Sequence, residues 1–158
     1  IGLGLNKRAP DVDISLTLTL LFPQTFDKKK MDVESIEKKV ENFIRLGYKY
    51  SLEGDWTNAG EAFYKASELD PTNTKALNNM GSAYLEIGKY KEAKEVFERA
   101  VSLAPNDPDI HYNLGLAYLK LDDLLSAKHS WEKTLSLNPA HEGASRNLRI
   151  LSIGGIGE

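Results

Sequence analysis

Apolar residues recur at spacings of three and four along most of the chain, which is the pattern of amphipathic helices. Pro71, Pro105 and Pro139 interrupt this pattern at regular intervals. Proline ends a helix because it lacks the backbone N–H and biases the residue before it away from helical geometry. The pattern therefore predicts an all-α fold, with helices at residues 33–53, 57–69, 74–87, 90–103, 108–121, 124–137 and 142–152.

The start of the chain follows a different pattern. The stretch "DISLTLTLLF", residues 13–22, alternates apolar and polar side chains as a β-strand does. "IGLGLN" also alternates, and "KRAPD" supplies a turn, so residues 1–22 are predicted to form a short β-hairpin or strand segment. Residues 1–30 would then be this segment and a linker.

A lone hairpin is marginally stable and has unpaired backbone groups at its edges. Three partners could pair with these edges: another copy of the chain, a different protein, or a β-domain upstream of Ile1. A flexible leader whose alternation is incidental is the fourth alternative. We expect self-association through residues 12–22.

An internal repeat organises the rest of the chain. Residues 40–73, 74–107 and 108–141 align without a gap at a period of 34. The aligned columns include Gly47, Gly81 and Gly115; Tyr50, Tyr84 and Tyr118; Ala59, Ala93 and Ala127; and Phe63, Phe97 and Trp131. A glycine inside a helix costs about 1 kcal/mol relative to alanine, so the glycine column predicts a close helix–helix contact.

These columns resemble the tetratricopeptide repeat (TPR) family over residues 40–141, most clearly in "ALNNMGSAYLEIGKYKEAKEVFERAVSLAPND". Thr134 replaces a small alanine, and Asp122 stands where Gly54 and Gly88 stand. The resemblance implies a TPR domain at residues 31–153, folded as a right-handed superhelix (an α-α solenoid). Residues 142–153 repeat only the start of a first helix and are expected to form a capping helix. Residues 154–158 would be a flexible tail.

In the resembling family, the first helix of each repeat lines a concave groove that binds peptides or protein segments. The corresponding positions here are Arg45, Tyr48, Leu52, Lys75, Asn78, Asn79, Ser82, Glu86, Asp109, Tyr112, Asn113, Leu116, Lys120, Arg146, Asn147 and Ile150. Asn79, Asn113 and Asn147 form one column, similar to the asparagine ladder of O-GlcNAc transferases. Each amide offers a donor and an acceptor, so the column is expected to hold an extended backbone; the alternative is that these side chains bond to a neighbouring helix.

The carboxylate clamp that holds chaperone C-termini in some family members is not expected. Ile44 and Tyr48 stand where the clamp has lysine and asparagine, and Asp109 and Asn113 stand where it has lysine and arginine. Only Asn79 fits the clamp. A terminal carboxylate would lack the cationic pair that favours its binding.

Composition limits the other functions. The chain has 158 residues, with 20 basic and 23 acidic residues intermixed, so no basic face favours nucleic acid. It has no cysteine, which fits a cytoplasmic and a periplasmic location alike. No apolar run is long enough for a transmembrane helix.

We expect no catalytic residue, metal site or cofactor, because His111, His129 and His141 lie at unrelated repeat positions and no nucleophile has a credible base. His111 is expected to be a packed core side chain. The sequence therefore predicts a non-catalytic protein-interaction module that binds a peptide or protein segment in its groove. The alternatives are a self-assembling scaffold and the C-terminal TPR domain of a larger, envelope-associated protein.

Overall fold

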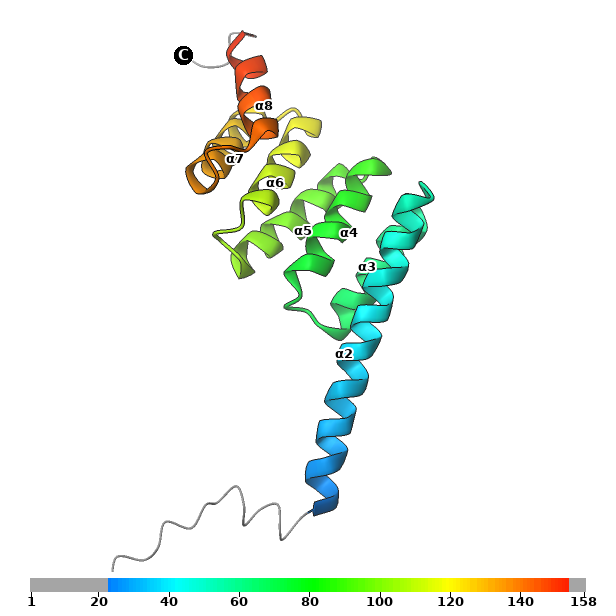
Figure 1. Cartoon of the computed structure of the whole chain (residues 1–158). Coiled ribbons are helices and arrows are strands. Elements are labelled where there is room, and N and C mark those ends of the chain that lie inside the picture. Colours follow the sequence, from blue (N-terminus) through cyan, green and yellow to red (C-terminus); the bar gives the residue numbers. More distant parts are fainter. Residues whose placement is uncertain (1–22, 154–158) are drawn as a thin grey trace, which may run out of the picture. The chain divides into compact units, whose positions relative to one another are not determined.

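A computed structural model of the protein describes residues 23–153 (Figure 1). The predicted hairpin over residues 1–22, the self-association through residues 12–22 and the tail at residues 154–158 lie outside the described residues. The described part of the chain consists of seven helices: α2 (Pro23–Leu52), α3 (Trp56–Leu69), α4 (Thr74–Glu86), α5 (Tyr90–Leu103), α6 (Pro108–Lys120), α7 (Leu124–Leu137) and α8 (Glu142–Ile153).

Helix boundaries agree with the prediction to within one residue, except at the start of α2. The prediction placed that start at residue 33, and the helix begins at Pro23. Proline suits the first turn of a helix, and the lysines and methionine that follow are good helix formers. The apolar periodicity used for the prediction begins only at Val33, so residues 23–30 are helix rather than linker.

Contacts divide the described chain after Glu37. Residues 23–37 are the first part of α2, where Val33 and Ile36 are exposed. Residues 38–153 belong to the other compact unit, which contains all three repeats and the capping helix.

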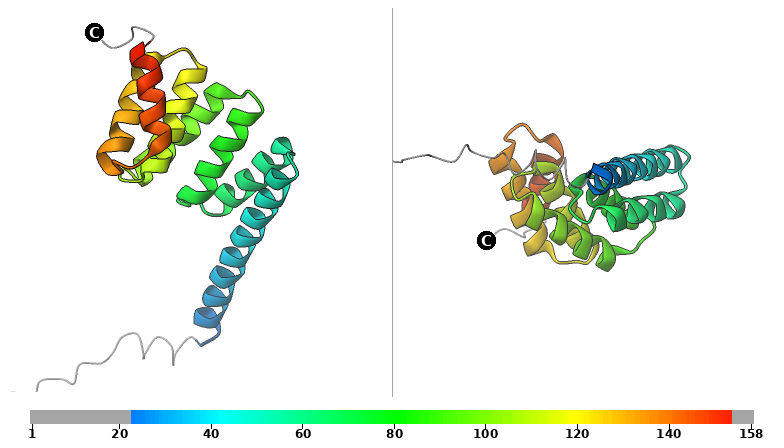
Figure 2. Two further views of the ribbon diagram at one scale, coloured as in Figure 1. Left: turned by 45° about the horizontal axis from the view of Figure 1, so that its top comes forward. Right: turned by 90° about the horizontal axis from the view of Figure 1, so that it is seen from below.

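Helices in this second unit pack in chain order. Each helix from α3 to α7 contacts the helix that follows it in the chain, and α4 also contacts α6 directly. Two further views show the successive helix pairs side by side (Figure 2). The first helices of the repeats, α2 from residue 38, α4 and α6, together with α8, are called the first-helix layer below. This arrangement of paired helices confirms the predicted α-α solenoid.

Local signals account for the helix ends. Asp55, Asn73, Asp107 and Asp123 each accept a backbone N–H bond at the start of a helix, which satisfies a donor that has no partner within the helix. Helices α3, α5 and α7 each end two residues before a proline, as predicted. Gly54 and Gly88 take the left-handed conformation at φ of +74° and +78° between paired helices, and Asp122 does so at +62°.

The glycine column is a contact surface, as predicted. A Cβ atom on Gly47 would lie 2.6 Å from the ring of Phe63, and one on Gly81 would lie 2.6 Å from the ring of Phe97. At Gly115, an added Cβ atom would overlap the indole of Trp131. These rings are almost fully buried, so each first helix packs on its own second helix through a bare backbone position.

Helix α8 covers the end of the third repeat. Ala144 and Leu151 are buried against Ala127 and Trp131, which confirms the capping role. Arg149 lies one period after Gly115, in the column that is glycine in all three repeats. The capping helix therefore lacks the bare position on which a second helix packs elsewhere in the array.

Candidate interaction surface

The predicted groove residues all lie on α2, α4, α6 and α8, and each is at least partly exposed. Leu52 is 90% exposed and Ile150 59% exposed, so apolar side chains stand among the polar ones. Arg45, Lys75, Lys120 and Arg146 contribute positive charge, and Glu86 and Asp109 negative charge. The surface thus has no single sign of charge, and it has both polar and apolar contact groups.

Between α2 and α4, the side chains of Tyr48 and Asn79 meet. Asn79 Nδ2 donates to the Tyr48 hydroxyl at 2.8 Å and to the Lys75 carbonyl at 2.8 Å. Tyr48 also packs edge-on against Phe63 with ring centroids 5.5 Å apart, and Lys75 Nζ lies 5.7 Å from the Tyr48 centroid. Both amide hydrogens of Asn79 are therefore used, and within the described residues its side-chain oxygen accepts no bond.

Between α4 and α6, Asn113 Nδ2 donates to Asn78 Oδ1 at 2.9 Å. Asn79 and Asn113 thus both bond to a neighbouring helix, which was the alternative interpretation of the asparagine column. Each still has polar capacity, because Asn113 has a second N–H and a side-chain oxygen with no partner among the described residues. Asn147 follows in the same column on α8 and is partly exposed. Binding of a partner backbone by this column stays a prediction.

Between α6 and α8, Tyr112 packs on His141, with ring centroids 4.6 Å apart. His141 Nε2 lies 3.7 Å from Asp109 Oδ1. A Cβ atom on Gly143 would lie 2.9 Å from the Tyr112 ring, so the capping helix approaches α6 closely here. Sequence reasoning missed His141 as part of this surface. The signal was present, because His141 follows Asn73 and Asp107 at the repeat period.

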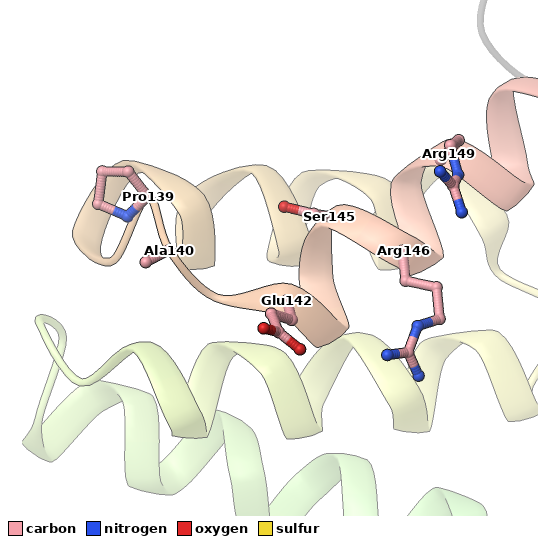
Figure 3. A pocket seen from close by; sticks show the side chains of 6 residues that line it. All are labelled: Pro139, Ala140, Glu142, Ser145, Arg146 and Arg149. Carbon is pink, nitrogen blue, oxygen red and sulfur yellow. The ribbon is translucent and has the colours of Figure 1, made fainter.

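The surface of residues 38–153 includes the following pockets. Two of them, of about 490 and 110 Å³, occupy the same repeat columns in repeats 3 and 1. They are lined by His111, Leu114, Tyr118, Leu125, Ser126, His129, Ser130 and Lys133, and by Phe43, Leu46, Tyr50, Asn58, Glu61, Ala62 and Lys65. The third, of about 370 Å³, lies against α8, where Figure 3 shows Glu142 at the start of the helix, Arg146 next along it and Arg149 farther toward its end.

His111 is buried and its Nε2 lies 2.9 Å from the Pro105 carbonyl, so it is the packed core side chain that was predicted. The described residues contain no group of three metal-ligating side chains. None of the described helices has an apolar stretch long enough to cross a bilayer.

Tyr118, a tyrosine at a repeat junction, has a raised pKa. The Tyr118 hydroxyl on α6 donates to Glu98 Oε1 on α5 at 2.8 Å. Burial of the ring and the neighbouring Glu98 carboxylate raise the pKa of Tyr118 to about 12. This bond links repeats 2 and 3 on the side of the second helices, so it is a structural contact rather than part of the predicted groove.

The fold and this surface define the class of the protein: a helical-repeat solenoid whose first helices share one accessible face. Family models agree. A model described as "TPR repeat" matches residues 81–122, and two described as "Tetratricopeptide repeat" match residues 62–95 and 108–141. The chain belongs to the tetratricopeptide repeat family. A comparison with curated protein sequences finds no match.

Solved TPR domains have the same fold. The first TPR domain of Spaghetti (RPAP3), bound to the HSP90 peptide SRMEEVD, is 28% identical with a TM-score of 0.72, covering 74% of this chain and 93% of that one. The second TPR domain of human RPAP3, in complex with the HSP70 peptide SGPTIEEVD, is 26% identical with a TM-score of 0.71, covering 74% and 98%. MamA is 25% identical with a TM-score of 0.71, covering 94% and 88%. TPR domains of this kind are generally non-catalytic interaction modules.

Proposed function

We propose that this protein is a non-catalytic interaction module that binds an extended segment of a partner protein along the first-helix layer. One observation carries the proposal: Asn79 and Asn113 are both fixed by interhelical hydrogen bonds and still have polar atoms to offer. Side chains that are held in place before binding lose less conformational entropy when a ligand arrives. A fixed column of amides is therefore well suited to a peptide backbone.

The bonding pattern predicts what Asn79 recognises. Its amide hydrogens are already used by Tyr48 and Lys75, so it can act only as an acceptor, for a backbone N–H of the ligand. Asn113 can donate and accept. Tyr48, Leu116 and the exposed Ile150 provide apolar contacts for alternate side chains of an extended segment.

We propose that the ligand is an internal segment and not a chain terminus. The RPAP3 domains bind HSP90 and HSP70 peptides. In this chain, the clamp positions hold Ile44 and Asp109, and the Asp109 side chain is 75% exposed. A carboxylate at this position repels a terminal carboxylate instead of neutralising it.

Peptide selection tests the proposal. A phage-displayed library is selected on the full chain, and the selected peptide is resynthesised with single backbone N-methyl groups. We expect one or two N-methyl positions to abolish binding, and Asn79→Ala with Asn113→Ala to weaken it. SRMEEVD with a free C-terminus should bind no better than its amidated form. Binding that tolerates every N-methyl group, or that needs the free carboxylate, would contradict the proposal.

A second candidate function is self-assembly. Val33 and Ile36 are 48% and 41% exposed and lie three residues apart on one face of α2, where a second copy could cover them. Light scattering over a concentration series separates the two functions, because a growing mass favours the scaffold. The variant Val33→Ser with Ile36→Ser should stop that growth, and deleting residues 1–22 tests the expected contribution of residues 12–22.

A further inference from the structure

The residues that immediately precede α4, α6 and α8 all cap the start of the helix that follows. Asn73 Oδ1 accepts the N–H of Ala76 at 3.0 Å, and Asp107 Oδ1 accepts the N–H of Ile110 at 3.4 Å. One period later, His141 Nδ1 accepts the N–H of Ala144 at 3.1 Å. The third residue of each helix is bonded in every case, so the imidazole of His141 is the N-cap of α8.

This hydrogen bond fixes the protonation state of His141. A nitrogen that accepts an N–H bond has no proton of its own, so the single proton of the neutral ring lies on Nε2. Nε2 is the atom that faces Asp109 Oδ1, at 3.7 Å. The ring also packs on Tyr112, with centroids 4.6 Å apart. In its neutral form, His141 thus holds α8 by its cap and by its contact with α6.

A second proton would have to bind Nδ1, where it would face the N–H of Ala144. The cap bond would be lost, because two donors cannot bond to each other. Asp109 favours the charged ring, and the His141 side chain is only 15% exposed, but the Asp109 side chain is 75% exposed and 3.7 Å is too long for a hydrogen bond. The attraction to Asp109 therefore does not replace the lost cap bond. Glu142 follows His141 directly, Arg146 lies one turn farther along α8, and the end of α7 presents the Asn138 carbonyl, which accepts the His141 backbone N–H at 3.1 Å.

We propose that His141 makes the docking of the capping helix sensitive to pH. Near neutral pH the cap is complete. When acid protonates His141, α8 loses its N-cap and opens more often. Opening uncovers apolar side chains that α8 packs against, among them Leu116, Trp131 and Leu135. The array would then present an apolar end surface in acid that it covers at neutral pH.

Amide hydrogen exchange of the full chain tests this inference. We expect the protection factor of the Ala144 amide, relative to amides of α4, to fall about fivefold between pH 8 and pH 5, the equivalent of the ~1 kcal/mol that an N-cap contributes. His141→Asn, which places the Asn73 residue type in the same column, should keep the protection and remove its pH dependence. His129→Asn changes an exposed histidine on α7 and is the matched control; it should behave as the unchanged protein.

Four results would overturn the inference. The Ala144 protection factor could stay constant from pH 8 to pH 5, or His141→Asn could retain the full pH response. Asp109→Asn distinguishes the cap from the ion pair. We expect the Ala144 protection factor of this variant to keep its pH response or to show a larger one. Loss of the response would mean that it comes from Asp109 and not from the cap. Nitrogen NMR of the ring gives a direct check, since a proton on Nδ1 at pH 8 contradicts the bonding described above.

Discussion

Asn113 Nδ2 donates a 2.9 Å hydrogen bond to Asn78 Oδ1, and this bond joins the first helices of repeats 2 and 3. The two residues contribute equally to the bond but differ in position, because only Asn113 belongs to the column of Asn79 and Asn147. A structural contribution and a ligand-binding contribution can therefore be separated by changing one residue and then the other.

Replacing Asn113 or Asn78 with alanine should lower stability by a similar amount, about 0.5–1.5 kcal/mol, because each change removes the same hydrogen bond. Chemical denaturation of both variants measures this effect. Asn113→Ala should weaken a peptide selected on the unchanged protein more than Asn78→Ala does, because it removes the ligand-binding amide, whereas Asn78→Ala removes the bond that holds this amide in place. Equal peptide affinities for the two variants would mean that the column is structural.

Gly115→Ala should destabilise the protein by about 1–3 kcal/mol, the usual cost of overpacking a core. The new methyl group would overlap the indole of Trp131, whose Nε1–H donates to the Tyr112 carbonyl at 3.2 Å. Gly60→Ala is the milder comparison, since its Cβ atom would lie 3.3 Å from the Tyr84 ring, a tight contact that a shift of a few tenths of an ångström relieves. We expect a smaller change there in thermal unfolding. A Gly115→Ala protein as stable as the Gly60→Ala protein would show that Trp131 can move aside at little cost.

Asp122→Gly should stabilise the protein by up to about 1 kcal/mol, because non-glycine residues are strained in the left-handed conformation. Asp122 has φ of +62° in the turn where Gly54 and Gly88 have +74° and +78°. The reverse change, Gly88→Ala, should destabilise by a comparable amount. Urea midpoints of the two variants should therefore move in opposite directions; a shift in the same direction would contradict this account.

Tyr118 should be the last group to titrate in an absorbance scan for tyrosinate, because its pKa is raised to about 12 by burial and by Glu98. A tyrosine whose pKa is higher in the folded than in the unfolded chain stabilises the protein fully below its ordinary pKa of about 10. That contribution is lost as the pH rises from about 10 through 12. Glu98→Gln should lower the pKa but leave it above the ordinary value, since burial remains. Tyr118→Phe should remove the transition at the highest pH from the scan. If that transition persists, the raised pKa belongs to another tyrosine.

Apolar periodicity predicted the helices that pack one face against a neighbour. It missed the helical residues at the start of α2, which lie outside the periodic pattern. The ends of α3 to α8 follow from apolar spacing and prolines, and the glycine column predicted the contacts of Gly47 with Phe63 and its equivalents. The start of α2 at Pro23 did not follow, because helix formers can extend a helix without apolar periodicity.

The groove residues were predicted by column, and the structure places them on one layer of helices. Their bonds could not be predicted. Asn79 reaches Tyr48, 31 residues away, and Asn113 reaches Asn78, 35 residues away. Such pairs depend on how far each first helix is shifted along its neighbour, a quantity that residue types in one repeat do not specify. His141 was missed because histidine is not among the usual N-cap residues.

Arg149, in place of the column glycine, determines where this array can grow. A fourth complete repeat appended after α8 would direct its ring residue, the counterpart of Trp131, at an arginine side chain instead of a bare backbone. A repeat duplicated upstream of His141 would meet glycine on both sides and keep α8 as its cap. A repeat inserted between α7 and α8 should therefore fold into the array more readily than a second helix added after α8, where Arg149 would have to move or be replaced by glycine.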